Sequence, residues 1–488
     1  MRVGTLLFPP AGLVLLWRSS EFSPGRKIFG TIGIALFSLI WSALVVVLMM
    51  RFCGLQVEFR GGMIPRLTFS KTLPDYAALE ANRARQRASS SAVMSTNSLL
   101  ARSAYWNGFR GPRRDGIYDE QPIRSDWPSE GLRPLWRQPI GGGYGSFAIA
   151  NGLAFTIEQR RQYEAVVAYD VSTGREVWTN SWEAEFQETL GGDGPRTTPA
   201  VAERLVYGLG ALGEFRCINA TNGQTIWRRN IVEENQAQHL TYGMAASPLI
   251  VQEKVIVAAG GPGGKSIIAY DRISGKPIWK SQSDEAAYGS PMLMELAGTQ
   301  QLVVVSDKRA MGLEPNTGKL LWQFPWIVLQ GNRNIAQPVQ IGPNRIFLSA
   351  GYGTGCAAFE VNDTADGFST QELWRNKNMK NKFTSSVYWK GAIYGLDEDI
   401  LTCLDAATGA RKWKEGRYGY GQILLAAEQL VILCGDGDVA IVAAKPSGPE
   451  ERCRFPAIRG KTWNQPAAAA GFLLVRNAVE MACFDLRF

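Results

Sequence analysis

The sequence predicts an all-β chain that forms an eight-bladed β-propeller with four-stranded blades, preceded by one N-terminal transmembrane helix. Three observations carry this prediction. A strand–turn–strand phrase that ends in Trp recurs about every 40 to 50 residues, a spacing typical of propellers and solenoids. Two separate markers of that phrase each occur eight times along the chain. A long apolar run without charge lies near the N-terminus.

The phrase is clearest in residues 167–178, which read as an apolar strand, a turn that contains Gly174, and a second strand that ends at Trp178. Further copies keep a Gly and a Trp at the same offsets, and they are Gly223 with Trp227, Gly275 with Trp279, Gly318 with Trp322, and Gly409 with Trp413. The copy that ends at Trp374 has its turn lengthened by an insertion. A propeller uses such an array as one closed domain, so we expect no division into smaller domains.

The blades can be counted by an outer marker, the Trp after each turn, and by an inner marker, the start of the next first strand. The outer marker stands at Trp136, Trp178, Trp227, Trp279, Trp322, Trp374, Trp413 and, in the eighth place, Phe455. The inner marker begins at Ser146, Thr198, Ser247, Ser290, Gln337, Ser385, Gln422 and Gln465.

The two chain ends each supply half a blade. No repeat strands precede Trp136, and the apolar strands expected at 472–476 and 481–485 have no Trp after them. We expect these halves to pair, because closing the ring removes the exposed edges that an open array would present. Eight blades is therefore the predicted number, with seven as the alternative.

The N-terminal part divides into three segments before the propeller at 105–488. Residues 1–27 are short and basic, and their apolar stretch of about a dozen residues is too short to span a bilayer. The charge-free run from Ile28 to Met50, bracketed by basic residues, predicts a transmembrane helix. Residues 51–104 form a juxtamembrane segment and linker, with a weak strand pattern in 54–69 and helical character in 74–88.

Charge is concentrated in the same N-terminal part. The chain carries a net charge of +8, and thirteen Lys and Arg against four Asp and Glu lie before Gly111. The remainder is near neutral, which gives no indication of a nucleic-acid partner. The basic N-terminal part favours a membrane surface instead. Charge on the two sides of the predicted helix is almost equal, so it does not fix the orientation.

The unit small-x-Asp-x-x-Thr/Ser-Gly-x-x-x-Trp resembles the repeat of the PQQ-like propellers, which include BamB-like assembly proteins and quinoprotein alcohol dehydrogenases. The resemblance covers residues 106–488, and it begins at the heptapeptide Trp-Asn-Gly-Phe-Arg-Gly-Pro. In that family each Trp docks against the small residue of its own blade and the glycine of a neighbour. Carried over here, this pairs Trp178 with Ala168 and Trp279 with Ala269. The resemblance thus implies architectural roles for the Trp residues and no chemistry by itself.

Residues for catalysis are scarce, and the sequence nominates no catalytic, cofactor-binding or metal-ligating residue. Resemblance to quinoprotein dehydrogenases would imply an adjacent Cys pair and often a CxxCH haem motif, and this chain has neither. His239 is the one histidine of the chain, and this shortage of histidine in practice excludes hydrolase triads and zinc sites. Cys217, Cys403 and Cys483 occupy the position that Ala fills in other copies, which predicts packing in a core strand. We expect no cofactor, with PQQ and Ca²⁺ as the less favoured alternative.

One pattern suggests a binding surface. The residues two positions before each inner marker are Tyr144, Arg196, Ala245, Tyr288, Ile335, Phe383, Tyr420 and Trp463. Because first strands line the axis of a propeller, the aromatic members of this set are expected to form a collar around one mouth of the channel. They either fill the narrow end of the channel or offer a stacking surface to a flat ligand or a partner peptide. The loop from Phe324 to Ile327 is a second exposed-aromatic candidate, with packing of its rings as the more usual alternative.

Architecture and anchoring favour a membrane-anchored, extracytoplasmic propeller that acts as a protein-interaction scaffold or accessory subunit of a membrane complex. The expected location is the bacterial inner membrane, with one pass and the propeller in the periplasm. A PQQ-dependent oxidoreductase and a non-catalytic small-molecule binder are the alternatives.

Overall fold

The protein is described by a computed structural model that places residues 9–53, 55–58, 66–69, 74–88, 106–128, 130–331 and 333–487. The chain forms two compact units, Met1–Lys71 and Thr72–Phe488, which we describe separately. The first unit contains the helices α2 (Pro9–Arg18) and α3 (Pro24–Phe52) and an antiparallel strand pair, β1 (Gln56–Glu58) with β2 (Arg66–Thr68). The strand pair lies where the weak alternating pattern predicted one.

Helix α3 contains the predicted span from Ile28 to Met50. It is long and apolar enough to cross a membrane, and it is the one such helix among the described residues. Helix α2 packs against its beginning. A Cβ on Gly30 would come within 2.8 Å of the Leu16 side chain, and Trp17 Nε1 donates a hydrogen bond to Thr31 Oγ1 at 3.0 Å. With ten residues α2 is about 15 Å long, half the thickness of a bilayer core.

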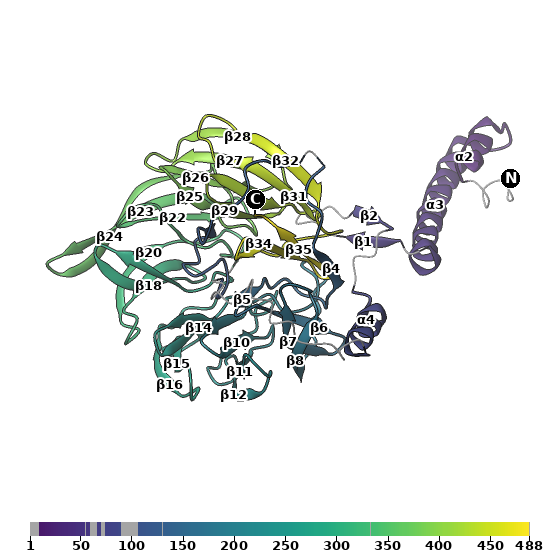
Figure 1. Cartoon of the computed structure of the whole chain (residues 1–488). Coiled ribbons are helices and arrows are strands. Elements are labelled where there is room, and N and C mark those ends of the chain that lie inside the picture. The colour runs from purple at the N-terminus through teal and green to yellow at the C-terminus, as the bar shows by residue number, and fades with distance from the viewer. Residues whose placement is uncertain are drawn as a thin grey trace. The chain divides into compact units, whose positions relative to one another are not determined.

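The second unit begins with α4 (Tyr76–Ala88) and continues as a ring of eight sheets (Figure 1). The first two sheets consist of β5 (Ala148–Ala150), β6 (Leu153–Arg160), β7 (Tyr163–Asp170) and β8 (Glu176–Glu183), and of β9 (Ala200–Ala202), β10 (Leu205–Leu209), β11 (Glu214–Asn219) and β12 (Thr225–Asn230). The next two consist of β13 (Leu249–Val251), β14 (Lys254–Gly261), β15 (Lys265–Asp271) and β16 (Pro277–Ser281), and of β17 (Met292–Leu296), β18 (Thr299–Val305), β19 (Arg309–Leu313) and β20 (Leu320–Pro325).

The ring continues with β21 (Val339–Gln340), β22 (Arg345–Ala350), β23 (Gly355–Thr364) and β24 (Gly367–Asn376), and with β25 (Val387–Trp389), β26 (Ala392–Asp397), β27 (Ile400–Asp405) and β28 (Arg411–Arg417). The seventh sheet contains β29 (Gln422–Ala426), β30 (Gln429–Leu433), β31 (Asp438–Ala443) and β32 (Glu450–Pro456), and β3 (Ile117–Tyr118) adds a parallel strand beside β29. The eighth contains β33 (Ala467–Ala469), β34 (Phe472–Arg476), β35 (Glu480–Asp485) and β4 (Trp136–Pro139).

This arrangement confirms the predicted eight blades and the predicted closure. Strand β4 pairs antiparallel with β35, so that Trp136 lies opposite Cys483 and the two chain ends share one sheet. Every blade therefore has a neighbouring blade on each side. One cluster of buried side chains spans the closure and includes Trp106, Tyr118 and Ile123 from the segment before β4. The hydrophobic core therefore continues across the point where the chain ends meet.

The spacing of Trp and Gly in the repeat has a direct structural reason. Each Trp lies opposite the small residue of its own blade, as Trp178 does opposite Ala168. In five blades the ring also covers the turn glycine of the next blade, and a Cβ on Gly223, for example, would come within 2.8 Å of the Trp178 indole. Gly223 also has a positive φ of 74°, which favours glycine. The indole N–H then reaches a carbonyl of the next blade, as in Trp178 Nε1 to Ala220 O at 2.9 Å.

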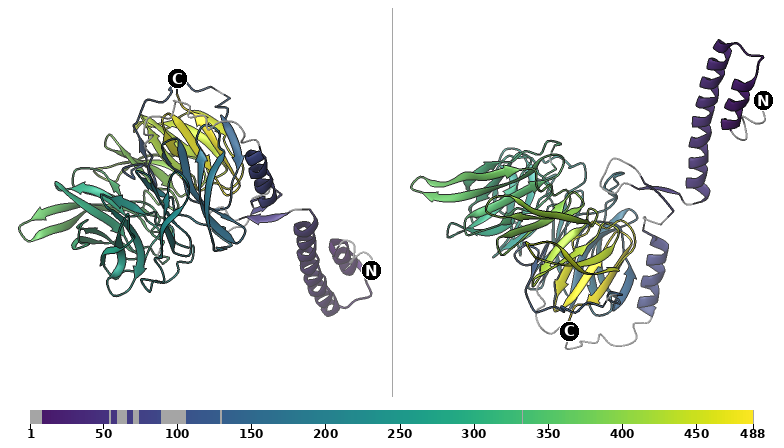
Figure 2. Two further views of the ribbon diagram at one scale, coloured as in Figure 1. Left: turned by 60° about the horizontal axis from the view of Figure 1, so that its bottom comes forward. Right: turned by 90° about the horizontal axis from the view of Figure 1, so that it is seen from above.

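The same indole contact to the next blade is made by five other Trp residues, Trp136, Trp227, Trp279, Trp374 and Trp413. Trp322 is the exception. Its Nε1 donates to Gln301 Oε1 of its own blade, and its ring packs edge-on against Phe359 at 5.5 Å. The next blade has no turn glycine to accept it, because the insertion extends β23 and β24 into a hairpin of ten-residue strands. Both views of Figure 2 show this green hairpin projecting beyond the other blades.

The placement of Phe455 as the eighth outer marker is wrong. The residue opposite Ile441, at the bulge where the other blades carry Trp, is Cys453, and Phe455 lies opposite Val439. Cys453 Sγ contacts Pro128 O at 3.3 Å, and Gly131 packs against Phe455. In the eighth blade the two chain ends take the place of the turn between the third and fourth strands. The segment before β4 therefore supplies the surface against which the seventh blade packs. Nothing in the local pattern distinguishes a Cys in this role from a core Cys.

Candidate functional site

The innermost segments of the blades form a ring of buried hydrogen bonds at the inner markers. All eight marker side chains are buried. Hydroxyl groups bridge neighbouring blades, since Ser146 N donates to Thr198 Oγ1, Thr198 N to Ser247 Oγ and Ser247 N to Ser290 Oγ, each at 2.9 Å. The Gln337 amide, in the orientation that satisfies both groups, continues the series with Ser290. These bonds satisfy backbone groups that cannot reach water, and they hold the first strands around the axis.

The predicted collar lies two residues before this ring. Seven of its eight positions are partly exposed, whereas Tyr288 is only 8% exposed. The change from buried marker to partly exposed collar occurs within two residues in every blade but that of Tyr288. The collar positions therefore face the surface at one end of the first strands.

Four collar rings from consecutive blades contact one another. The ring centroids are 5.6 Å apart for Tyr144 and Trp463, 4.5 Å for Trp463 and Phe383, and 5.5 Å for Phe383 and Tyr420. Tyr288, from the other side of the ring of blades, packs instead against Tyr242 at 5.8 Å. The structure thus brings together four of the five predicted collar residues, and it places the fifth, which is buried, against the partly exposed Tyr242.

The ring faces are covered by cations. Lys461 Nζ lies 4.3 Å from the Trp463 ring and 5.5 Å from Tyr144, and Lys382 Nζ lies 5.0 Å from Tyr420. The Arg196 guanidinium lies 5.3 Å from Tyr144, and Arg333 lies over Tyr242 and Tyr352. Tyr144, Tyr420 and Trp463 therefore each have a cation beside the ring. The collar presents positive charge that is held in place by aromatic rings.

The collar cations have few carboxylate partners. Glu398 Oε2 lies 3.9 Å from Lys382 Nζ and accepts from the Tyr420 hydroxyl at 3.4 Å. Arg196 donates to the carbonyl oxygens of Gly192 and Gly194, both at 2.7 Å. Burial lowers the pKa of Lys382, although Glu398 raises it, and burial likewise lowers the pKa of Arg196. In both cases the loss of hydration lowers the pKa more than the nearby carboxylates raise it.

The segment from Trp106 to Asp115 lies on the other side of the inner markers from the collar, because it contacts residues at the markers and after them. Trp106 forms a bridge with Ile149, about 16 Å along the chain from the collar residue Tyr144. Arg110, 1% exposed, donates to Ser386 O at 2.9 Å and Ser385 O at 3.3 Å. Its neighbour Arg114 reaches a different part of the ring. We call residues 106–115 the plug.

Arg114 is 4% exposed and donates to Pro291 O at 2.8 Å, to Ser247 O at 3.1 Å and to Pro248 O. The two plug arginines therefore bind strand carbonyls from three blades. Burial lowers the pKa of Arg114 to about 9 and that of Arg110 to about 10, although Asp115 raises the latter. Sequence reasoning missed both residues, because their contacts lie more than a hundred positions away in the chain.

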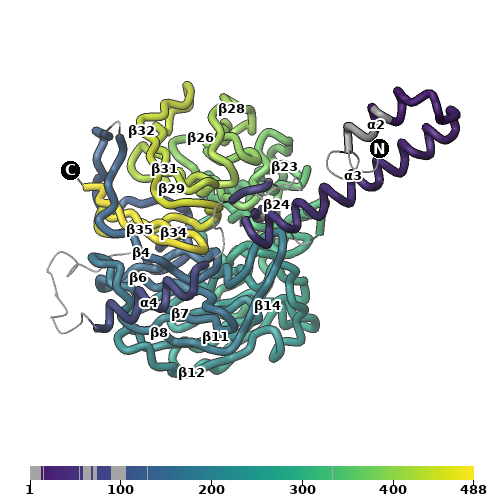
Figure 3. Tube along the Cα trace, turned by 90° about the vertical axis from the view of Figure 1, so that its right-hand side faces the viewer, coloured from purple at the N-terminus to yellow at the C-terminus, as the bar shows by residue number. Residues whose placement is uncertain are grey.

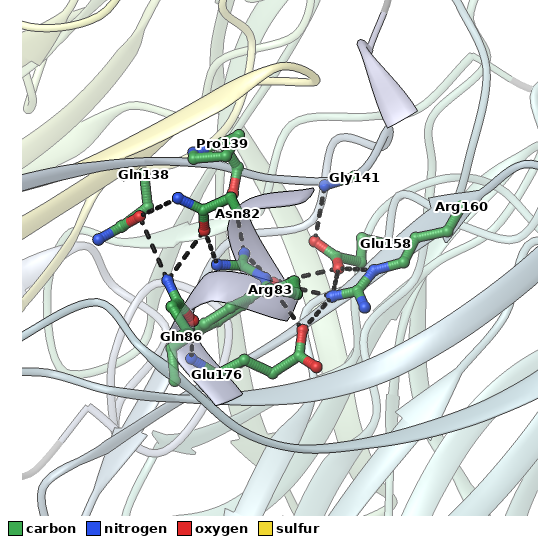
Figure 4. A network of polar contacts seen from close by, with 10 residues as sticks. Asn82, Arg83, Gln86, Gln138, Pro139, Gly141, Glu158, Arg160 and Glu176 are labelled. Atoms are coloured by element: carbon green, nitrogen blue, oxygen red, sulfur yellow. Dashed lines mark hydrogen bonds and ion pairs between the residues drawn. The ribbon is translucent and has the colours of Figure 1, made fainter. Parts of the chain in front are cut away.

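A third polar cluster joins α4 to the seam between β4 and the β5–β8 sheet, along which α4 runs in Figure 3. Arg83, 3% exposed, donates to Pro139 O at 2.8 Å and pairs with Glu176 at 3.1 Å. Arg160 bridges Glu158 and Glu176, as Figure 4 shows. Burial raises the pKa of Glu158, but Arg160, Arg476 and Arg83 together hold it below its usual value. This cluster is fully paired and fixes the helix to the propeller.

Three other sequence candidates behave as structural or surface residues. Phe324 and Trp326 are 4% and 2% exposed, so these rings are packing, and the exposed-aromatic alternative is wrong. The long β23–β24 hairpin covers them, since Phe359 stacks on Phe324 at 4.1 Å and Arg375 lies over Trp326. His239 is exposed in the loop between β12 and β13.

The cysteines and acidic residues form no evident reactive centre. Cys217, Cys403 and Cys483 are buried opposite Trp227, Trp413 and Trp136, in the position predicted for them. All seven cysteines are free thiols, and Cys53 alone is exposed. Among the residues that the structure describes, no group of three or more His, Cys, Asp or Glu side chains is placed to hold a metal ion.

The sequence of this chain is similar to sequences of known proteins. A family model described as outer membrane protein assembly factor BamB matches residues 162–415. A BamB from Burkholderia pseudomallei is 24% identical over 368 residues, which cover 65% of this chain and 90% of that protein. A BamB from Bordetella pertussis is 20% identical over 211 residues, covering 43% of this chain and 49% of that protein.

Two solved structures share the fold. The crystal structure of BamB from Moraxella catarrhalis aligns with a TM-score of 0.51 and 16% identity, over 72% of this chain and 97% of that one. The quinohemoprotein alcohol dehydrogenase from Comamonas testosteroni aligns with a TM-score of 0.55 and 12% identity, over 84% of this chain and 83% of that one. At these identities the likeness concerns the fold alone.

Proposed function

The chain belongs to the family of the outer membrane protein assembly factor BamB, and from that premise we propose that it is a membrane-anchored protein-interaction scaffold, an accessory subunit of a membrane complex. The matched relatives are named assembly factors, and one of them is matched over 90% of its length. Scaffolding needs a stable surface and no reacting group. The closed ring of eight blades supplies such a surface.

The observation that carries this proposal is the difference between the two ends of the first strands. At the plug, Arg110 and Arg114 are buried and bound to backbone carbonyls. At the collar, partly exposed rings and cations from consecutive blades lie next to one another. Aromatic and Arg side chains at a partly exposed site are the residue types that dominate binding energy in protein interfaces.

The proposal places the anchor in the bacterial inner membrane and the propeller in the periplasm. Helix α3 supports a single pass, and the BamB family membership favours an extracytoplasmic propeller. Protease added to intact spheroplasts is expected to digest the propeller. Digestion that requires lysed cells would contradict this orientation, and it would leave the scaffold role itself to the experiment below.

PQQ with Ca²⁺ is the alternative cofactor, and the described residues do not fit it. A quinone with carboxylates could meet the collar cations, but a Ca²⁺ ion needs a set of oxygen ligands. No cluster of three or more His, Cys, Asp or Glu is assembled for a metal among the described residues. We therefore derive no step through PQQ. The test of the alternative is dehydrogenase activity and quinone absorbance of the purified chain with and without PQQ and Ca²⁺.

The scaffold proposal is tested by photo-crosslinking in intact cells. A benzoylphenylalanine at Tyr420, in the collar, is expected to give a discrete protein adduct. The matched control is the same probe at Tyr163, which is 44% exposed at the turn between β6 and β7 and is expected to give none. Equal labelling from both positions, or activity that depends on added PQQ, would overturn the proposal.

A further inference from the structure

The N-terminal unit contains a helix that the proposed function leaves without a role. Helix α2 has only apolar residues from Pro9 to Trp17, and its first charged residue is Arg18. A helix that lies flat on a membrane surface has a charged or polar face opposite its apolar face. Helix α2 has no such face, and Val14 and Trp17 are 52% and 53% exposed. Helix α2 therefore needs apolar surroundings on more than one side.

Helix α2 is held against α3 by apolar and polar contacts. Leu16 is 4% exposed, and a Cβ on Gly30 would come within 2.8 Å of its side chain. Trp17 Nε1 donates to Thr31 Oγ1 at 3.0 Å, and Lys27 Nζ donates to Trp17 O at 3.2 Å. The end of α2 thus lies beside the start of α3, and the two helices run antiparallel, as the right view of Figure 2 shows.

The depth of α2 in a membrane follows from this partner. The contact residues Gly30 and Thr31 lie within the charge-free run of α3 that begins at Ile28. A helix that packs on these residues and extends toward the middle of α3 lies in the same leaflet of the bilayer as the first half of α3. Because α2 is about 15 Å long, it reaches about the middle of a hydrocarbon core of about 30 Å.

The two ends of α2 suit these different depths. A helix that begins in hydrocarbon has to satisfy its first four backbone N–H groups, which have no partner within the helix. The first two residues of α2 are Pro9 and Pro10, and proline has no N–H, so the number of such donors is reduced. At the other end, Arg18 and Arg26 are exposed on either side of the turn between the helices. Basic side chains at this depth meet lipid headgroups.

We propose that α2 is an intramembrane half-helix, which lies in one leaflet beside α3 and contacts lipid acyl chains with the face that α3 does not cover. The anchor is then a helical hairpin whose basic turn lies at the headgroups. Burial of the apolar side chains of α2 adds to the attachment that a single span provides. This inference rests on the membrane anchoring in the proposed function and specifies the form of the anchor.

Depth measurements distinguish an inserted helix from a flat one. The full-length chain carrying Cys53→Ser, which removes the exposed thiol, is reconstituted in phospholipid vesicles with one of the changes Ala11→Cys, Val14→Cys or Ser20→Cys. A bimane label on the new thiol is quenched by lipids that carry a nitroxide at the headgroup or in the acyl chain. The label at position 11 is expected to lie about 4.5 Å deeper than the label at position 14, from a rise of about 1.5 Å per residue. The label at position 20 is expected at the headgroups.

The reference for depth is a label in α3. Leu36→Cys changes a residue that is 60% exposed and lies near the level of position 11, counted from the contact between Leu16 and Gly30. Because the helices are antiparallel and packed together, the labels at positions 11 and 36 are expected at the same depth to within about one helical turn, 5 Å.

Crosslinking tests the packing of the two helices in the same vesicles. A short reagent with two thiol-reactive groups is expected to join Leu16→Cys to Gly30→Cys, which mass spectrometry of the digested chain detects. The matched control pairs Leu16→Cys with Gly33→Cys, because Gly33 has no neighbouring atom within 4 Å. This pair is expected to give at least about tenfold less crosslinked product, since successive residues on a helix point about 100° apart.

The outcomes separate the half-helix from the anchor. Equal depths at positions 11 and 14, or equal crosslinking of the two cysteine pairs, overturns the half-helix. If the label at position 36 is still quenched from the acyl chains, the membrane anchoring of the proposed function stands. If that label is not quenched from the acyl chains, α3 does not cross the membrane, and the anchoring and the half-helix both fail. The circular dichroism spectrum of each variant excludes loss of the fold as the cause.

Discussion

The two ends of the propeller axis use the same side-chain chemistry in opposite ways. At the plug, Arg110 and Arg114 are buried and donate to backbone carbonyls of the first strands. At the collar, Lys461 and Lys382 lie on aromatic rings and keep part of their surface exposed. Positive charge that is buried among carbonyls holds strands together, whereas positive charge that is half exposed on rings remains able to bind. The surroundings, and not the residue type, separate a structural from a recognition role.

Both ends exist only while the ring is closed, so the largest expected effect comes from opening it. Deleting residues 472–488 removes β34 and β35 and leaves β4 without its partner strand. Strand β33 also loses its partner, and the neighbouring blades expose much of the shared core cluster. We expect loss of the cooperative melting transition by circular dichroism. A truncated chain that kept the full transition would show that closure does not stabilise the ring.

Replacing an arginine at the plug tests the structural half of the comparison. Arg114→Met removes donors from the carbonyls of Ser247, Pro248 and Pro291, which are left without their partner in a buried site. Because each buried unsatisfied group costs about 1 to 3 kcal/mol, we expect a loss of about 4 kcal/mol in the free energy of unfolding. Urea denaturation measures this loss.

The matched change at the collar is Lys461→Met, which replaces a half-exposed cation by the same apolar side chain. Its expected cost is about 1 to 2 kcal/mol, because it removes cation–π contacts with two partly exposed rings and the hydrogen bond from Lys461 to Gly191 O. Equal costs for Arg114→Met and Lys461→Met would contradict the distinction between the two ends.

The eight blades could be predicted because the signal for them is local. Trp178 needs a small residue opposite it and a glycine beneath it, and both recur at fixed spacing in the sequence. The plug could not be predicted, since Arg110 and Arg114 meet residues 133 to 276 positions away and have no periodicity. The positions of the collar residues could be predicted from the sequence, but the positive charge around them was not predicted. Lys461 lies two residues before Trp463, and Lys382 immediately precedes Phe383, so the signal was present.

The two failed predictions have the same origin. Phe324 was expected to be exposed, but the inserted β23–β24 hairpin folds over it and Thr370 Oγ1 donates to Gln323 O at 2.9 Å. Phe455 was expected to take the outer-marker position, but the seventh blade docks on a segment from before β4. In both cases a segment distant in sequence replaces a surface that the regular repeat would provide. The repeat pattern predicts that each blade needs a packing surface from its neighbour. It does not predict which segment provides that surface at an irregular blade.

A buried acid away from both ends tests whether burial shifts the pKa of a side chain, as it does for the two plug arginines. Glu164 in β7 is fully buried and accepts from Ala211 N at 3.0 Å, and burial raises its pKa to about 7. The folded state therefore binds a proton more readily than the unfolded state between about pH 4.5 and 7. Stability from this group is fully present below pH 4.5 and is lost as the pH rises through 7, by about 3 kcal/mol.

The measurement is the free energy of unfolding of the wild type and of Glu164→Gln across that pH range. The variant has no titrating group at this position, so the difference between the two proteins is expected to change with pH, with the wild type relatively weaker at pH 8 than at pH 5. A constant difference across the range would show that Glu164 is not the group responsible.

A last pair of changes lies within the collar and distinguishes its two kinds of ring. Tyr288 is 8% exposed and packs against Tyr242, so Tyr288→Ala is expected to cost about 3 kcal/mol as a core truncation. Tyr420 is half-buried beside Phe383 and Lys382, so Tyr420→Ala is expected to cost about 1 kcal/mol. If the contiguous rings serve recognition, Tyr420→Ala weakens capture of the partner protein while the melting transition hardly moves. If both variants unfold the chain to the same extent, the rings are packing alone, and the half-exposed end of the axis is as structural as the plugged one.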